Sequence, residues 1–242
     1  MGSKRRIAKE ILPIILKDRK EGQWYVEPFC GGCNLIDKVT ENRIASDINK
    51  YLIAFLKYVQ ENEFNPEHIG EDKYKEIQKN KDNYPDWLVG YVGFNLSFGA
   101  KFFGGYRRDK AGKRDYENEA QQNIEAQQPY LKGIQFFNCN YYELEIPNES
   151  IIYCDPPYQG TTKYKNGLDY NKFWDWCREK INEGHKIFVS EYNAPEDFEC
   201  VWEKEIVSSL TKDTGSKKGI EKLFVHKSQN NIVKKAEQML LF

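Results

Sequence analysis

The 242-residue sequence lacks several features that define whole classes of protein. No uninterrupted apolar run approaches the roughly 20 residues that a membrane-spanning helix needs. The first residues do not show the apolar segment and small-residue cleavage site of a signal peptide. Six cysteines are also far too few for a disulfide scaffold of this size. We therefore expect a cytoplasmic protein in a reducing compartment, without a membrane partner.

Signals for metal and dinucleotide sites are equally sparse. Cys30 and Cys33 have the spacing of half a zinc site, but no second Cys-x-x-Cys follows, and the three histidines are scattered along the chain. The dinucleotide pattern Gly-x-Gly-x-x-Gly is absent. We therefore expect no metal and disfavour NAD and FAD, while a redox pair or a purely structural turn remain other interpretations of residues 30–33.

Enough apolar material is present for a packed interior, with 40% hydrophobic and 14% aromatic residues. The net charge is only -1, but positive charge is concentrated in three segments. Residues 1–20, 101–116 and 212–235 carry net charges of +5, +4 and +5. Such a distribution suits a phosphate-rich partner, although three separate solvated surfaces would give the same count.

Apolar spacing predicts strands that alternate with helices. A strand at 23–29 leads into the glycine turn 30–34 and a helix, and a second strand at 43–47 leads into a helix at 51–59. Further strands are predicted at 134–138, 151–154 and 186–190, with weaker candidates near 203–208 and 222–225. Two strand–helix units in succession favour an α/β protein with a parallel sheet.

The long gap after the second strand predicts an insertion. From residue 47 to residue 134 is 134 − 47 = 87 positions, far more than the roughly 30 residues of a strand–helix–strand unit. We therefore predict a catalytic domain formed by residues 1–60 and 131–242, interrupted by a smaller lobe at 61–130.

Two polar features follow predicted strands. Gly31 has no side chain, so a ligand can approach the turn closely, with its charged part near the next helix N-terminus. Asp47 ends the second strand, where a carboxylate can accept hydrogen bonds from both hydroxyls of a ribose. The alternative role of Asp47 is to cap the helix that follows.

The sharpest signal is Asp155-Pro-Pro-Tyr158, which directly follows the apolar strand 151–154. Pro156 and Pro157 cannot extend a central strand, so the tetrapeptide forms a stiff segment at the carboxyl edge of the sheet. A carboxylate, a fixed carbonyl and an aromatic ring suit the binding of a planar amine. The amine of a nucleobase is a poor nucleophile until two acceptors orient its hydrogens and free its lone pair. An ordinary proline-rich strand exit is the alternative.

These motifs and their order resemble the Dam-like D12 class of DNA adenine-N6 methyltransferases. The resemblance spans most of the chain and rests on segments 2–9, 27–32, 45–49, 136–144, 155–158 and 186–190. It implies a Rossmann-like class I methyltransferase sheet, with the insertion at 61–130 as the target-recognition domain. It also implies a bacterial or phage-infected cell as the setting. Cys33 replaces the second glycine of the family's Phe-x-Gly-x-Gly pattern, and Asn140 stands where an acidic residue is common.

The resemblance implies S-adenosyl-L-methionine as cofactor and double-stranded DNA as partner, with the target base flipped out of the duplex. Asp155, Pro156, Pro157 and Tyr158 would hold that base. The implied cofactor-binding residues are Lys4, Phe29 and Gly31 for the methionine end, Asp47 and Ile48 for the ribose and adenine, and Asn140 and Asp155.

Basic residues in two loops are the candidates for DNA contacts. The segment 95–108 interleaves aromatic and basic residues, as a loop that probes bases and phosphates does, and its predicted contacts are Lys101, Arg107 and Arg108. The segment 208–222 resembles the basic loop that contacts the duplex backbone in the family, and its predicted contacts are Lys217 and Lys218. A packed hairpin with solvated arginines and an ordinary surface loop are the alternatives. Alternative functions are cytosine-N4 methylation and an inactive relative that only binds nucleic acid, the latter suggested by Cys33 and Asn140. The sequence specifies no oligomeric state and is compatible with a monomer.

Overall fold

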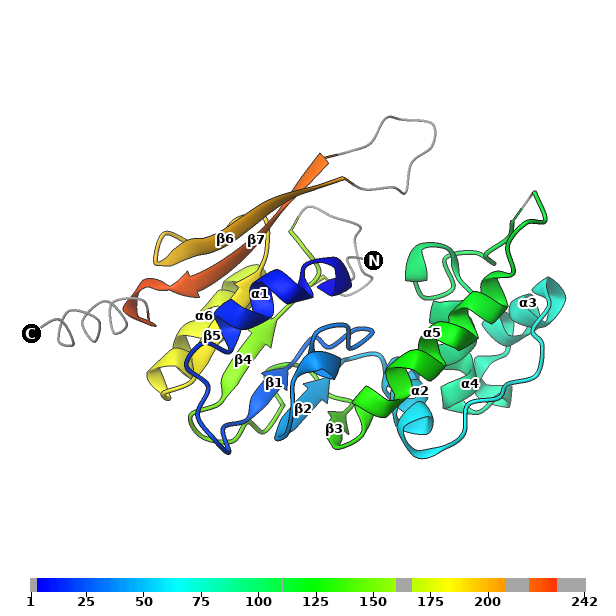
Figure 1. Ribbon diagram of the computed structural model, residues 1–242, viewed down its shortest axis with the longest axis horizontal. Helices are drawn as coiled ribbons and strands as arrows, with labels where there is room; N and C mark the ends of the chain where they lie inside the picture. Colours follow the sequence, from blue (N-terminus) through cyan, green and yellow to red (C-terminus); the bar gives the residue numbers. More distant parts are fainter. Residues whose placement is uncertain (1–3, 110, 160–166, 208–217, 230–242) are drawn as a thin grey trace, which may run out of the picture. The chain divides into compact units, whose positions relative to one another are not determined.

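The computed structural model describes residues 4–109, 111–159, 167–207 and 218–229 (Figure 1). The chain divides into two compact units, of which the first comprises Met1–Arg5 and Cys30–Leu144, and the second Arg6–Phe29 and Glu145–Phe242. No helix in the described part of the chain has the length and apolar character needed to cross a membrane.

The first unit contains two short parallel strands, β2 (Arg43–Ser46) and β3 (Ile134–Phe137). They pair in register from Arg43 opposite Ile134 to Ser46 opposite Phe137, so both strands end at the same edge. Helix α2 (Lys50–Glu61) follows β2. The Asn49 side chain caps α2 by accepting hydrogen bonds from the N–H groups of Tyr51 and Leu52.

Helices make up most of the remaining first unit. They are α3 (Glu71–Lys79), α4 (Asp86–Gly90), the π-helical η4 (Tyr91–Asn95) and α5 (Tyr116–Leu131), joined by the short 3-10 turns η3 (Lys81–Asn83) and η5 (Phe98–Ala100). Helix α4 lies directly against α2, since a β-carbon added at Gly90 would stand only 2.0 Å from the carbonyl oxygen of Tyr51. The helices of the predicted lobe at 61–130 therefore share one compact unit with α2, β2 and β3. The division into a catalytic domain (1–60 and 131–242) and a recognition domain (61–130) stays a prediction.

The second unit contains strands in the order β1 (Tyr25–Glu27), β4 (Ile151–Cys154), β5 (Lys186–Ser190), β7 (Lys218–His226) and β6 (Phe198–Val207). Strands β1, β4 and β5 are parallel, whereas β7 runs antiparallel to both β5 and β6. All four residues of β4 are buried, as expected for a central strand of a parallel sheet. The β6–β7 pair is longer than the weak strands predicted near 203–208 and 222–225.

Helices α1 (Ala8–Ile15) and α6 (Tyr170–Asn182) complete the second unit (Figure 1). Parallel strands alternating with helices, followed by the antiparallel β6–β7 pair, confirm the predicted Rossmann-like α/β class.

The helix predicted after the glycine turn is shorter than expected. Only the 3-10 turn η2 (Ile36–Lys38) forms there. The chain then reverses through Glu41 and Asn42, both with left-handed backbone angles, so that β2 can begin at Arg43. The segment 35–42 therefore contains a single 3-10 turn in place of the predicted helix.

Candidate functional site

The glycine turn lies beside the end of β2 in the first unit. The N–H of Cys30 donates to the carbonyl of Ser46 at 2.9 Å, and the N–H of Cys33 closes the turn by donating to the carbonyl of Cys30 at 2.8 Å. Gly31 has a φ of +47°, and a β-carbon added to it would have no atom within 4 Å. The turn thus presents backbone with open space beside Gly31.

Cys33 adopts a conformation that favours glycine. Its φ is +55°, although it carries a side chain and is fully buried. The left-handed region costs a residue with a β-carbon about 1–2 kcal/mol, which is a physical reason for glycine at this position in the family pattern.

Among the described residues, no group of three or more histidine, cysteine, aspartate and glutamate side chains could hold a metal ion.

Asp47 follows β2 and contacts the glycine turn. One carboxyl oxygen accepts the N–H of Gly31 at 3.3 Å, and the other accepts the N–H of Asn49 at 2.9 Å. Burial raises the pKa of the Asp47 carboxyl, and the two N–H donors oppose that rise. The residue that caps α2 is Asn49, so Asp47 does not have the alternative role of helix cap. The neighbouring Ile48 is 67% exposed and offers an apolar surface next to this carboxylate.

The end of β3 adds two asparagines at the same edge of the first unit. The Asn138 side chain donates to the carbonyl of Asp47 at 2.9 Å, and the N–H of Asn140 donates to the Glu143 carboxylate at 3.0 Å. Asn138 was not predicted from the sequence, although its position after a strand parallel to β2 is the signal that indicates it. Lys4 also belongs to the first unit, where it is buried in the 3-10 turn η1 (Lys4–Arg6).

The Asp155–Tyr158 tetrapeptide leaves the carboxyl end of β4 in the second unit. Asp155 is half-buried and Pro156 is buried. The Tyr158 hydroxyl donates to the Glu221 carboxylate on β7 at 2.7 Å, and its ring meets Tyr192 edge-on with centroids 4.7 Å apart. Burial, reinforced by the negative charges of Asp155 and Glu221, raises the pKa of Tyr158 far above its ordinary value. Tyr158 therefore remains a neutral hydrogen-bond donor.

A buried carboxylate that the sequence interpretation missed supports the segment after Tyr158. Glu191, which follows β5, is 1% exposed. Its carboxylate accepts the N–H of Gln159 at 3.0 Å and the N–H of Tyr192 at 2.7 Å. The Tyr170 hydroxyl holds the same segment by donating to the carbonyl of Pro157. The signal for Glu191 is an acidic residue directly after a buried strand parallel to β4.

Comparison with known families then identifies the chain. A model of the D12 class N6 adenine-specific DNA methyltransferase family matches residues 1–87 and 87–212. The chain belongs to this family. The match confirms the predicted family and its enzyme class, a methyltransferase.

Two solved structures are similar to this D12 family member. One is SMU.472, assigned as a methyltransferase and complexed with SAH, with 11% identity and a TM-score of 0.38 over 93% of this chain and 53% of that chain. The other is HI0767 from Haemophilus influenzae, assigned as a methylase, with 9% identity and a TM-score of 0.34 over 92% and 98% of the two chains. The D12 chain thus spans 53% of SMU.472 and nearly all of HI0767.

The structure places the predicted cofactor-binding residues of this methyltransferase in both units. Gly31 and Asp47 are joined by a hydrogen bond, and Lys4 and Asn140 lie in the same first unit. Phe29 lies in the second unit, where its ring packs edge-on against Phe173 with centroids 5.7 Å apart. Their roles in binding stay predictions.

The predicted DNA-binding residues occupy different environments. Lys101 is exposed near Phe98, whose side chain is 57% exposed. Arg107 lies over the Tyr116 ring at 4.0 Å, and Arg108 pairs with Glu71 at 2.8 Å. An isolated bridge between Ser97 and Tyr106 closes this loop, and its contact with DNA stays a prediction. Lys218 begins β7, and Lys217 lies outside the described residues.

Proposed function

We propose that this chain is a site-specific DNA methyltransferase that transfers a methyl group from S-adenosyl-L-methionine to adenine N6 in double-stranded DNA. The observation that carries the proposal is Asp155-Pro-Pro-Tyr158 at the carboxyl end of β4, in a chain of the D12 family. Ligands of parallel α/β sheets bind at this edge. The target adenine must leave the duplex before its amine can reach a site of this kind.

The tetrapeptide activates the amine by geometry. The Asp155 carboxylate and the Pro156 carbonyl accept hydrogen bonds from the two N–H groups, which draws the nitrogen towards sp³ and frees its lone pair. Proline suits the second acceptor position because its ring limits the backbone there. With S-adenosyl-L-methionine bound as methyl donor, the amine nitrogen would accept the methyl group, S-adenosyl-L-homocysteine would leave, and the proton lost by the nitrogen would pass along its hydrogen bond to the Asp155 carboxylate.

Tyr158 positions the base in this proposal. Its ring stacks on the flipped adenine, and its hydrogen bond to Glu221 fixes the direction of the ring. The raised pKa of Tyr158 keeps that hydrogen bond in place at neutral and mildly alkaline pH, because the phenol does not ionise.

The first-unit residues fit the proposed cofactor. Gly31 leaves open space beside its backbone, Asp47 offers two carboxyl oxygens to ribose hydroxyls, and exposed Ile48 offers an apolar surface to an adenine ring. Lys4 and Asn140 are the other first-unit residues of the proposed set, while Phe29 and Asp155 belong to the second unit. When bound, S-adenosyl-L-methionine supplies an electrophilic methyl group on its sulfonium sulfur.

Basic residues outside this site bind the duplex in the proposal. Lys101, Arg107 and Arg108 lie in the recognition segment, Lys218 begins β7, and Lys217 is the preceding residue in the sequence. Because Arg107 and Arg108 already approach Glu119 and Glu71, contact with phosphates exchanges one ionic partner for another. Because neutralised phosphates release their counterions, DNA affinity should fall steeply as the salt concentration rises.

Substitution of Asp155 by alanine tests the proposal. At saturating S-adenosyl-L-methionine, Asp155→Ala should still bind DNA but lose methyl transfer by about 100-fold to 1,000-fold, the usual effect of removing one orienting hydrogen bond at a reacting centre. Transfer of tritiated methyl groups to duplex DNA measures the rate. Asp175→Ala, which removes an exposed carboxylate of α6, is the matched control with expected wild-type activity.

Equal rates for Asp155→Ala and the wild type would contradict the role of this carboxylate. Mass spectrometry of the digested DNA identifies the modified base in the same experiment. N6-methyladenine supports the proposal, whereas N4-methylcytosine would replace adenine with cytosine as the target.

A further inference from the structure

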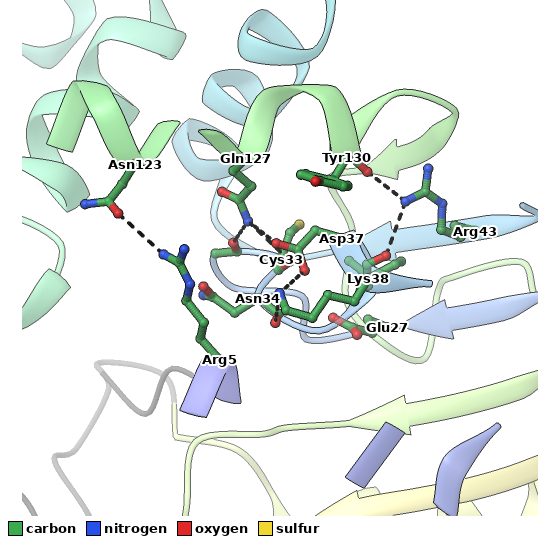
Figure 2. Close-up of polar contacts among 12 residues, drawn as sticks. Arg5, Glu27, Cys33, Asn34, Asp37, Lys38, Arg43, Asn123, Gln127 and Tyr130 are labelled. Atoms are coloured by element: carbon green, nitrogen blue, oxygen red, sulfur yellow. Dashed lines mark hydrogen bonds and ion pairs between the residues drawn. The ribbon is translucent and has the colours of Figure 1, made fainter. Parts of the chain in front are cut away.

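One side chain of α5 reaches into the glycine turn of the first unit. The Gln127 amide nitrogen lies 3.0 Å from the carbonyl oxygen of Gly32, 3.3 Å from that of Cys33 and 3.0 Å from a carboxyl oxygen of Asp37 (Figure 2). Its two hydrogens are therefore shared among three acceptors on the turn and the segment directly after it. More than 90 residues separate the amide from this turn in the sequence.

These bonds act on a turn whose backbone is costly to maintain. Cys33 has a φ of +55° and cannot relax as glycine would. The only freedom of a peptide plane is rotation about its flanking dihedral angles, so fixing the Gly32 and Cys33 carbonyls fixes the dihedrals on both sides of Cys33. Gln127 thus holds the part of the turn where the glycine of the family pattern is missing.

The same face of α5 also contacts the N-terminal segment. The Asn123 side chain accepts a hydrogen bond from Arg5 at 3.4 Å (Figure 2). Asn123 and Gln127 are four positions apart, so they project from one side of the helix. Arg5 directly follows Lys4, and both segments that α5 contacts here contain residues assigned above to the methionine end of the cofactor.

We propose that Gln127 is a positioning residue for the cofactor: its amide holds residues 31–33 in the geometry that binds S-adenosyl-L-methionine. This inference rests on the proposed function and assigns a role in cofactor affinity to the helix that ends the inserted segment. Gln127 acts through the backbone of the turn and takes no part in the transfer of the methyl group.

A matched pair of substitutions on α5 tests the inference in the full chain. Gln127→Met keeps the length and helix propensity of the side chain but removes its donors. Gln128→Met makes the same change one residue later, where the amide donates at 2.7 Å to the carbonyls of Val59 and Asn62 at the end of α2. Both variants lose comparable hydrogen bonds to backbone carbonyls, so thermal unfolding should show similar losses of stability.

Cofactor affinity should distinguish the two variants. Calorimetric titration with S-adenosyl-L-methionine should give a Kd about tenfold higher for Gln127→Met, which corresponds to about 1.4 kcal/mol, and a wild-type Kd for Gln128→Met. The KM for the cofactor should rise by a similar factor while kcat at saturation changes little. A second variant, Gln127→Glu, places a carboxylate against both carbonyls and Asp37, so its Kd should rise further.

Equal cofactor Kd values for the Gln127 variants and Gln128→Met would overturn the inference, as would a fall in kcat with an unchanged KM. If Gln127→Met does not fold, the Kd of Gln127→Glu decides by the same criterion. A wild-type chain that does not bind S-adenosyl-L-methionine would overturn the proposed function itself, which is a different result.

Discussion

Replacing Gly31 by alanine tests whether a ligand occupies the space beside the glycine turn. A β-carbon at Gly31 would meet no atom within 4 Å, so the new methyl group has no neighbour to displace in the protein. The cost is confined to the left-handed backbone at φ +47°, about 1–2 kcal/mol. For a chain of this size, the melting temperature should fall by about 2–8 °C.

Gly22→Ala provides the matched control. Gly22 has a φ of +74° in an exposed turn before β1, and a β-carbon there would also have no atom within 4 Å. The two alanines therefore bring similar backbone strain and a similar loss of stability. Gly31 is assigned to the cofactor site, whereas Gly22 is not.

Titration with S-adenosyl-L-methionine then distinguishes the effect of backbone strain from a direct clash between the new methyl group and the bound cofactor. If the cofactor lies against Gly31, the added methyl group overpacks the complex by about 1–3 kcal/mol, which raises Kd by about 5-fold to 150-fold. Gly22→Ala should bind as the wild type does. A wild-type Kd for Gly31→Ala, measured with the expected loss of melting temperature, would show that the cofactor does not approach this glycine.

Two further predictions concern the carboxylate of the first unit and the aromatic ring of the second. Burial raises the pKa of Asp47 in the folded protein above the ordinary value of 3.8. The free energy of unfolding therefore falls as the pH rises from 3.8 through the folded-state pKa, because the buried carboxyl must then ionise. Asp47→Asn should therefore gain unfolding free energy relative to the wild type between about pH 4 and pH 7 in urea titrations, while its cofactor affinity falls; a pH-independent difference would contradict this. Tyr158→Phe loses the bond to Glu221 but keeps the ring, so its kcat should fall less than that of Tyr158→Ala, which also forfeits about 1–3 kcal/mol of base stacking. Wild-type turnover by Tyr158→Ala would exclude the stacking role.

Much of the site could be predicted from local sequence because its main residues follow strands. Short apolar runs predict strands, and the residues that follow neighbouring parallel strands lie at the same edge of the sheet. Asp47 after β2 and Asp155 after β4 both stand at such positions. The family match confirmed the family that these motifs indicated, while the roles of the individual residues stay predictions.

Contacts between distant segments could not be predicted in this way. Asn49, and not Asp47, caps α2, and the expected helix after the glycine turn is only η2. Glu191 also follows a buried parallel strand, but no glycine or proline motif adjoins it, so the sequence does not indicate what it contacts. Its role emerges only from the two N–H groups that it accepts.

The amino-acid sequence by itself determined the α/β class, the methyltransferase family and the order of the motifs, since these depend on periodicity and on short segments of chain. Tertiary structure decided how the motifs are held: the amide of Gln127 on the Gly32 and Cys33 carbonyls, and the hydroxyl of Tyr158 on Glu221. Such bonds join residues far apart in the chain and require donor and acceptor within about 3 Å of each other. Only the folded backbone brings them to that distance.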